Sequence, residues 1–297
     1  MGSFLTSRFI TYLLGGISSG VVIALVALSL VIIWKSTHVL NFAQGAMGMF
    51  AAFVGMNLVF KGTNYWLCVL LSLAVGLALG GVTERVLIRP LYGKPEINPI
   101  VVMVGFLGVI ESAIPSIWHS NLLPVPTPFS QVYYQNNGHT ILISPFVIFQ
   151  VVLALGIMGG VALLFQYTNL GLKMRAAALA PEVSRLLGVR VNRLLTLGWI
   201  LSSGVGAMAG VIVSSGQSLA ATNMDGIFVS AFIAAAVGGL ESPVGAITGG
   251  LLIGVTESFI LGYWSSNMAP LAGVIVLVIS LAIRPQGIFT RNVTRRV

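Results

Sequence analysis

The sequence FITYLLGGISSGVVIALVALSLVIIW, residues 9–34, is an apolar run without a single charged side chain. About 20 consecutive apolar residues in a helix are enough to cross the hydrocarbon core of a bilayer. The run is too long for the apolar core of a secretion signal, which has roughly 7–15 residues. It therefore predicts a membrane-spanning helix near the N-terminus.

The composition extends this interpretation to the whole chain. Of the 297 residues, 57% are hydrophobic and only 7% are charged, whereas a soluble domain carries about 25% charged residues. No Asp, Glu, Lys or Arg occurs in residues 112–172. We expect an all-α, polytopic integral membrane protein with a single transmembrane domain, 1–297, and about eight transmembrane helices, some of them interrupted or re-entrant.

The expected spans follow from the apolar runs. The run 227–240 is too short to cross a bilayer comfortably, which favours a half-helix or a re-entrant segment. The other runs are 9–34, 40–60, 65–83, 100–118, 145–167, 194–215, 243–261 and 268–283.

The basic residues indicate the orientation. Residues 84–99, 168–193 and 284–297 together hold 12 of the 15 Lys and Arg residues. Short basic loops lie on the cytoplasmic side of a membrane. These three segments, including the C-terminus, are therefore predicted to be cytoplasmic, whereas the proline-rich segment 119–144 and the N-terminus are predicted to be external. The net charge of +8 thus reflects membrane orientation, with lipid as the surrounding partner and no nucleic acid.

The longest polar interruption of the second half is GLKMRAAALAPEVSRLLGVRVNR, residues 171–193. Pro181 suits the first turn of a helix and Gly188 suits its end. Between them, apolar residues recur at helical spacing and share one face: Val183, Leu186, Leu187 and, further on, Val191. A short amphipathic helix on a charged loop predicts a docking surface.

Polar residues inside apolar runs are costly and usually face a path or a partner. Asn41 and Gln44 open the second run, where a helix N-terminus can hold a carboxylate; the alternative is that Asn41 caps its own helix. Glu257 either lines a cavity or is a buried hydrogen-bonding group. For Glu111 an interfacial, solvated carboxylate is expected, and for Asp225 a helix cap.

Nothing in the sequence predicts catalysis or a metal site. The chain has no phosphate-binding loop of an ATPase and no hydrolase motif. The histidines His38, His119 and His139 lack metal-ligand spacing. The single cysteine, Cys68, lies in an apolar run and is expected to be a small buried side chain.

Glycine is abundant in the chain. The spacings Gly76…Gly80, Gly156…Gly160 and Gly250…Gly254 are typical of closely packed membrane helices.

The sequence also contains a faint internal repeat. SSGV at 18–21 recurs at 202–205, and MFAAFVG at 49–55 is similar to FIAAAVG at 232–238. In the expected topology the two halves run in opposite directions, and inverted repeats are typical of transporters.

Five segments stand out in order along the chain: NFAQG (41–45), ERV…RPLYG (84–93), the loop 171–189, AVGGLESPVGA (236–246) and RPQGI (284–288). Together they resemble the permease subunits of branched-chain amino acid ABC importers (the hydrophobic amino acid uptake type). The chain departs from the resemblance at Leu179 and Ala180, where such permeases often have an acid or amide that caps the helix, and at Glu241, where they often have glycine.

The resemblance implies a non-enzymatic inner-membrane subunit with several partners. These are a second homologous permease, two cytoplasmic ATPases that bind ATP and magnesium, and an external solute-binding protein. It implies that the helix in 171–193 couples to an ATPase through Ala178, Pro181, Glu182, Leu186, Leu187 and Gly188. The substrate path would run beside Asn41, Gln44 and Glu257.

Three alternatives remain at this stage. One is an ion-coupled secondary transporter or channel, which the scarcity of intramembrane ionisable groups disfavours. Another is an importer of the same type for urea or short amides. The third, a non-transporting scaffold, is disfavoured by the interrupted helices.

Overall fold

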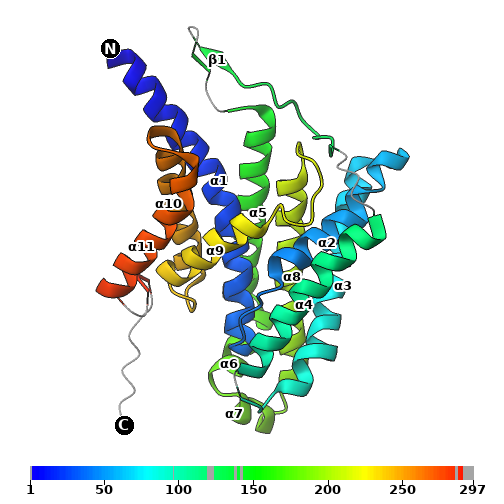
Figure 1. Ribbon diagram of the computed structural model, residues 1–297. Helices are drawn as coiled ribbons and strands as arrows, with labels where there is room; N and C mark the ends of the chain where they lie inside the picture. Colours follow the sequence, from blue (N-terminus) through cyan, green and yellow to red (C-terminus); the bar gives the residue numbers. More distant parts are fainter. Residues whose placement is uncertain are drawn as a thin grey trace.

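A computed structural model of the protein describes residues 2–95, 97–118, 124–136, 139–140, 143–284 and 287–289. In these residues the chain forms a bundle of helices with one short hairpin (Figure 1). Six of the described helices are long and apolar enough to cross a membrane, and two further apolar helices are shorter. The predicted all-α, polytopic class is confirmed.

The first half contains four helices: α1 (Gly2–Thr37), α2 (Gln44–Met56), α3 (Tyr65–Thr83) and α4 (Ile97–Trp118). Short helical turns join them at Val59–Lys61, Glu84–Ile88 and Arg89–Leu91. The hairpin strands β1 (Gln135–Asn136) and β2 (His139–Thr140) pair antiparallel. The second half contains α5 (Pro145–Tyr167), α6 (Asn169–Leu179), α7 (Pro181–Leu186), α8 (Val191–Ser214), α9 (Asp225–Gly238), α10 (Pro243–Tyr263) and α11 (Ala269–Ile283), with a turn at Ser266–Met268.

Side-chain caps explain where three of the long helices begin. Asn64 accepts a hydrogen bond from the main-chain N–H of Trp66 at the start of α3. Ser144 and Ser242 cap α5 and α10 in the same way, and each is followed by a proline. A short polar cap satisfies a free N–H of the first turn, and proline suits the first helical position.

The core lies around α1 and α8. In the apolar window of each helix, 89% of the α1 residues and 83% of the α8 residues are buried, against 17% for α4 and 11% for α5. Cys68 is buried, as predicted. The apolar outer faces of α4 and α5 are thus left for lipid or for another membrane subunit.

The structure corrects the second predicted span. The run 40–60 is apolar, but its helix, α2, has only 13 residues, which is about 20 Å of helix. His38 adopts a left-handed φ of 53° after α1, and residues 38–43 are not helical. After α2, Gly62 takes a φ of 84° in the next turn. A non-helical stretch therefore separates α1 from α2, and α2 is too short to be a full span.

The short segment 227–240 is confirmed as a short helix. It corresponds to α9, which has 14 residues. The capping role predicted for Asp225 is wrong, because Asp225 is the first helical residue and Met224 precedes it without a side-chain cap. A carboxylate in the first turn still interacts favourably with the helix dipole.

Small residues set the closest helix crossings. Gly20 of α1 packs directly on Gly254 of α10, and Gly80 of α3 packs on the main chain of Trp199 in α8. Gly254 and Gly80 have no room for a Cβ atom, so two of the predicted small-residue pairs do pack helices. A Cβ atom at Gly156 or Gly160 would meet no other atom within 4 Å. The prediction that this pair packs against another helix is therefore wrong within this chain.

The packing repeats between the two halves. The contact of α1 with α10 corresponds to that of α8 with α3, and α1 with α9 corresponds to α8 with α2. The pairs α2–α3 and α9–α10 also correspond. The indole N–H of Trp199, near the start of α8, donates to Thr37 at the end of α1, so these central helices are antiparallel. The internal repeat predicted from the sequence is an inverted one.

Candidate functional site

A cavity of about 860 Å³ lies between α1, α5, α8, α9 and α10. Its wall mixes apolar residues, such as Ile23 and Ile233, with many polar ones, such as Gln150 and Asn223, and Glu257 of α10 contributes a carboxyl group. The Ser230 hydroxyl donates a hydrogen bond of 2.7 Å to Glu257 Oε1. A cavity of this size in which apolar and polar side chains converge can hold a small molecule. Glu257 therefore lines a cavity and is hydrogen-bonded there, but it is only partly buried.

The segment between α4 and α5 contacts the connection between α8 and α9 beside this cavity. The main-chain N–H of Val125 donates to the carbonyl of Gln217 over 3.0 Å, and the N–H of Gly216 donates to the carbonyl of Val125 over 3.0 Å. Gln131, Gly216 and Gln217 belong to the cavity wall. The cavity is thus bordered by the proline-rich segment, which the sequence predicts to be external, and by the connection between α8 and α9.

Asn41 and Gln44 lie in a separate, enclosed network. The Asn41 Oδ1 accepts from the N–H of Ala43 over 3.0 Å, and its Nδ2 donates to Gln44 Oε1 over 2.9 Å. Gln44 Nε2 donates to Ser29 Oγ over 3.1 Å and to the carbonyl of Ser202 over 3.0 Å. Both amides are almost fully buried. Asn41 bonds within the turn before α2, and the predicted capping of the helix by Asn41 is wrong, because α2 begins after Ala43 without a side-chain cap. Gln44 joins α2 to α1 and α8 where the repeated halves cross.

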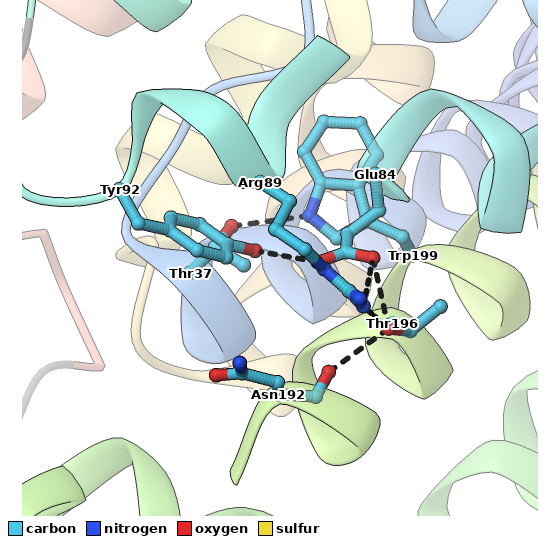
Figure 2. A network of polar contacts seen from close by, with 7 residues as sticks. All are labelled: Thr37, Glu84, Arg89, Tyr92, Asn192, Thr196 and Trp199. Carbon is cyan, nitrogen blue, oxygen red and sulfur yellow. Dashed lines mark hydrogen bonds and ion pairs between the residues drawn. The ribbon is translucent and has the colours of Figure 1, made fainter. Parts of the chain in front are cut away.

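A buried carboxylate joins α3 to α8 (Figure 2). Glu84 has no exposed surface, and its two oxygens accept from Arg89 Nε over 3.3 Å and from Arg89 Nη2 over 3.0 Å. Thr196 Oγ1 of α8 lies 2.8 Å from Glu84 Oε2 and also accepts from Arg89 Nη2 over 2.8 Å. Burying a carboxylate this fully is costly unless such partners bond to it.

Tyr92 completes this network. Its hydroxyl donates to Glu84 Oε1 over 3.2 Å. Burial, together with the neighbouring Glu84 carboxylate, raises the pKa of Tyr92 well above its usual value. The hydroxyl therefore remains a donor at neutral pH, and the turn after α3 is held to the first turns of α8.

The predicted docking helix is present. It is α7, which begins at Pro181 and follows Ala180 without a side-chain cap. Gly188 adopts a φ of 79° just after it, as the sequence predicts. Leu186 and Leu187 are 88% and 78% exposed. Large apolar side chains exposed together on a polar connection indicate an interaction surface.

The other predicted residues of this connection differ in how far they are exposed. Val183 and Glu182 are exposed, so Val183 shares the apolar face with Leu186 and Leu187. The side chains of Ala178 and Pro181 lie outside the described part of the chain. Val191 is buried, so the prediction that it lies on the exposed apolar face is wrong.

The sequence did not predict the helix α6. Thr168 caps it by accepting from the N–H of Gly171 over 3.1 Å. Met174 and Ala177 of α6 form a buried cluster with Val191 and Leu194 of α8. The residues before and after α7 are thus packed into one cluster.

Sequence reasoning missed several polar residues that structure brings together. Ser230 and Thr196 carry no signal of their own, because serine and threonine in a helix commonly bond to the main chain one turn earlier. Glu84 and Arg89 were noted in a motif without a role. Only the three-dimensional arrangement places the Thr196 hydroxyl, which is 112 positions away, against Glu84.

A helical membrane protein with a solute-sized cavity near one end and an exposed apolar helix near the other has the parts of a transport permease. The chain belongs to the family described as "Branched-chain amino acid transport system / permease component", which matches residues 12–284. The chain is thus a non-catalytic membrane subunit, and ATP is used by separate ATPase subunits. ATPase and solute-binding proteins are the partners of a permease of this class.

Individual relatives span nearly the whole chain. The high-affinity branched-chain amino acid transport system permease protein BraD of Pseudomonas aeruginosa is 27% identical over 98% of both chains. The probable branched-chain amino acid transport permease protein LivH of Methanocaldococcus jannaschii is 26% identical over 92% of this chain and 90% of its own. The fructose import permease protein FruF of Bifidobacterium longum is 25% identical over 84% of this chain and 71% of its own.

Proposed function

We propose that this chain moves branched-chain or related small amino acids into the cell as the permease of an ATP-driven importer that works by alternating access. The observation that carries the proposal is the match, over 98% of both chains, to a permease named for branched-chain amino acids. The cavity beside Glu257 supports it, because apolar wall residues such as Ile23 and Ile233 can face an aliphatic side chain and the Glu257 carboxyl group can face an ammonium group.

The orientation follows from the charges. The basic segments around α6 and α7 and after α3 lie at the end of the bundle away from β1 (Figure 1). With these segments cytoplasmic, the N-terminus is external in a cytoplasmic or inner membrane. The cavity beside Glu257 then opens near the external connections, where a solute-binding protein would deliver its ligand.

The path would continue from this cavity past the centre of the bundle. Asn41 and Gln44 are enclosed between α1, α2 and α8 in this structure, and we assign them to the part of the path that opens later in the cycle. Polar amides there would offer hydrogen bonds to a solute that has left water. The exposed apolar faces of α4 and α5 fit a second, homologous permease on the other side of the path.

Coupling would occur at α7. An ATPase groove would receive Leu186 and Leu187, with two ATPase subunits serving two permeases. Closure of the ATPases on ATP would move α7, and the α6–α8 cluster would pass this movement to α8. Two leucines this exposed on a basic connection fit a docking surface.

Uptake into cells that carry the complete transporter and lack other leucine uptake tests the substrate. Labelled leucine should be taken up, and excess valine or isoleucine should compete, whereas fructose, urea and acetamide should not. Competition by fructose or urea without competition by valine would overturn the proposed substrate class. It would leave the membership of the permease family intact.

A further inference from the structure

A second cavity lies at the end of the bundle that carries α6. Its volume is about 250 Å³, and its wall comes from α1, α5, α6, α8 and the connection between α9 and α10. A neighbouring cavity of about 190 Å³ shares Lys35, Phe165 and Arg175 with it. Neither cavity shares a residue with the one beside Glu257. The space is therefore separate from the candidate path described above.

Three charged groups line the second cavity. Lys35 belongs to α1, Arg175 to α6 and Glu241 to the connection after α9. Among the residues that the structure describes, none of the three is joined to another by an ion pair. His38 lies in the same wall. Two cations and one carboxylate thus line the same cavity, and no ion pair joins them among the described residues.

The rest of the wall is apolar. Phe165, Met174, Leu194 and Leu195 supply it. Trp34 also lines the cavity, and its indole N–H is buried without a partner among the described residues. Buried donors are nearly always hydrogen-bonded in folded proteins, so an acceptor from a ligand would remove an unmet hydrogen bond.

These groups match one kind of ligand. We infer that the second cavity is a binding site for a free amino acid with an aliphatic side chain, on the side of the membrane to which the amino acid is released. The carboxylate meets Lys35 and Arg175, the ammonium group meets Glu241, and the side chain lies against Phe165 and Leu194. Charge-assisted hydrogen bonds of this kind are about twice as strong as neutral ones. The inference rests on the proposed function for its orientation and its substrate class.

The site would have a consequence for the transport cycle. Arg175 and Met174 lie on α6, directly before the docking helix α7, whereas Lys35 lies on α1. A bound amino acid contacts both elements at once. Its occupancy therefore joins the helix that senses the ATPase to the central helix of the bundle.

Equilibrium binding to the purified full chain tests the site. The chain is placed in nanodiscs of phosphatidylcholine, which offers no net anionic headgroup, and labelled L-leucine is the probe. We expect saturable binding. Isocaproate, which is leucine without its ammonium group, and isoamylamine, which is leucine without its carboxylate, should each compete at least tenfold more weakly than leucine.

The variants then assign the charges. Lys35→Gln and Arg175→Gln should each weaken leucine binding about tenfold or more, and Glu241→Gln should weaken leucine while leaving isocaproate unchanged. Lys173→Gln is the matched control, since Lys173 lies on α6 but outside the cavity wall, and it should change nothing.

Two outcomes would overturn the inference. One is the absence of saturable leucine binding. The other is binding that Glu257→Gln abolishes and Arg175→Gln leaves intact, which would place the ligand in the cavity beside Glu257. Either outcome leaves the proposed function standing if leucine uptake by the complete transporter persists, whereas loss of that function would show in the uptake competition itself.

Discussion

Replacing Arg89 with methionine should destabilise the bundle through Glu84. The change keeps a long apolar stem and removes the only cation that bonds to this buried carboxylate in the described structure. Removing one member of a fully buried ion pair costs about 3–5 kcal/mol. Arg89 is 33% exposed, and Tyr92 and Thr196 remain as partners, so solvent screening reduces the expected loss to about 2–4 kcal/mol.

The protein carries its own probe for this measurement. Cys68 is the one cysteine of the chain and is buried in α3, so a thiol-reactive fluorescent dye reacts when the bundle opens. For a chain of 297 residues the expected loss corresponds to a fall of roughly 3–6 °C in the melting temperature. Variants are compared at one heating rate, because unfolding of this kind is often irreversible.

Two further variants complete the test. Arg85→Met is the matched control, because Arg85 is an exposed neighbour of Glu84, and it should shift the melting temperature by no more than about 2 °C. The double variant Glu84→Gln/Arg89→Met should recover at least half of the loss, since no charge remains buried. If Arg89→Met behaves like Arg85→Met, or if the double variant is worse than either single one, Glu84 does not depend on Arg89 as described.

Three other changes have expected outcomes. Leu187→Asp should leave the melting temperature unchanged, since the side chain is exposed, but should abolish ATP-dependent leucine uptake, while Leu187→Met keeps it; unchanged uptake in the aspartate variant would argue against docking through α7. Glu257→Gln should lower leucine uptake about tenfold through loss of one charge-assisted contact, and Ser230→Ala should lower it less; equal uptake in all three proteins would remove Glu257 from the path. Gly80→Val should cost about 1–3 kcal/mol of stability by overpacking the α3–α8 contact, whereas Gly156→Val should have little effect, and dye-reported melting that ranks the two variants the other way would contradict the described packing.

The membrane class was predictable from the sequence because hydropathy over 20 residues is a local property. The run 9–34 and the basic segments are visible without any tertiary information. The shortness of α2 was not, because 40–60 contains no charged residue and no proline, and its few polar residues do not mark a break. The break depends on the turn at His38 and on Gln44, whose amide bonds to α1 and α8 only when both helices are in place.

The candidate sites show the same division. The start and end of α7 follow from Pro181 and Gly188, which act on their immediate neighbours. The contact of Ser230 with Glu257 joins residues 27 positions apart on two helices, and no spacing rule connects them. The cavity that Lys35 shares with Arg175 likewise exists only because α1 ends beside α6.

If ATP, used by a partner bound at α7, drives solute through this chain, leucine uptake must depend on ATP. This is measured in sealed vesicles that contain the complete transporter with its solute-binding protein, with ATP and with proton or sodium gradients applied separately. We expect uptake with ATP in the absence of any ion gradient, and none with a gradient alone. Uptake that follows an ion gradient without ATP would contradict it.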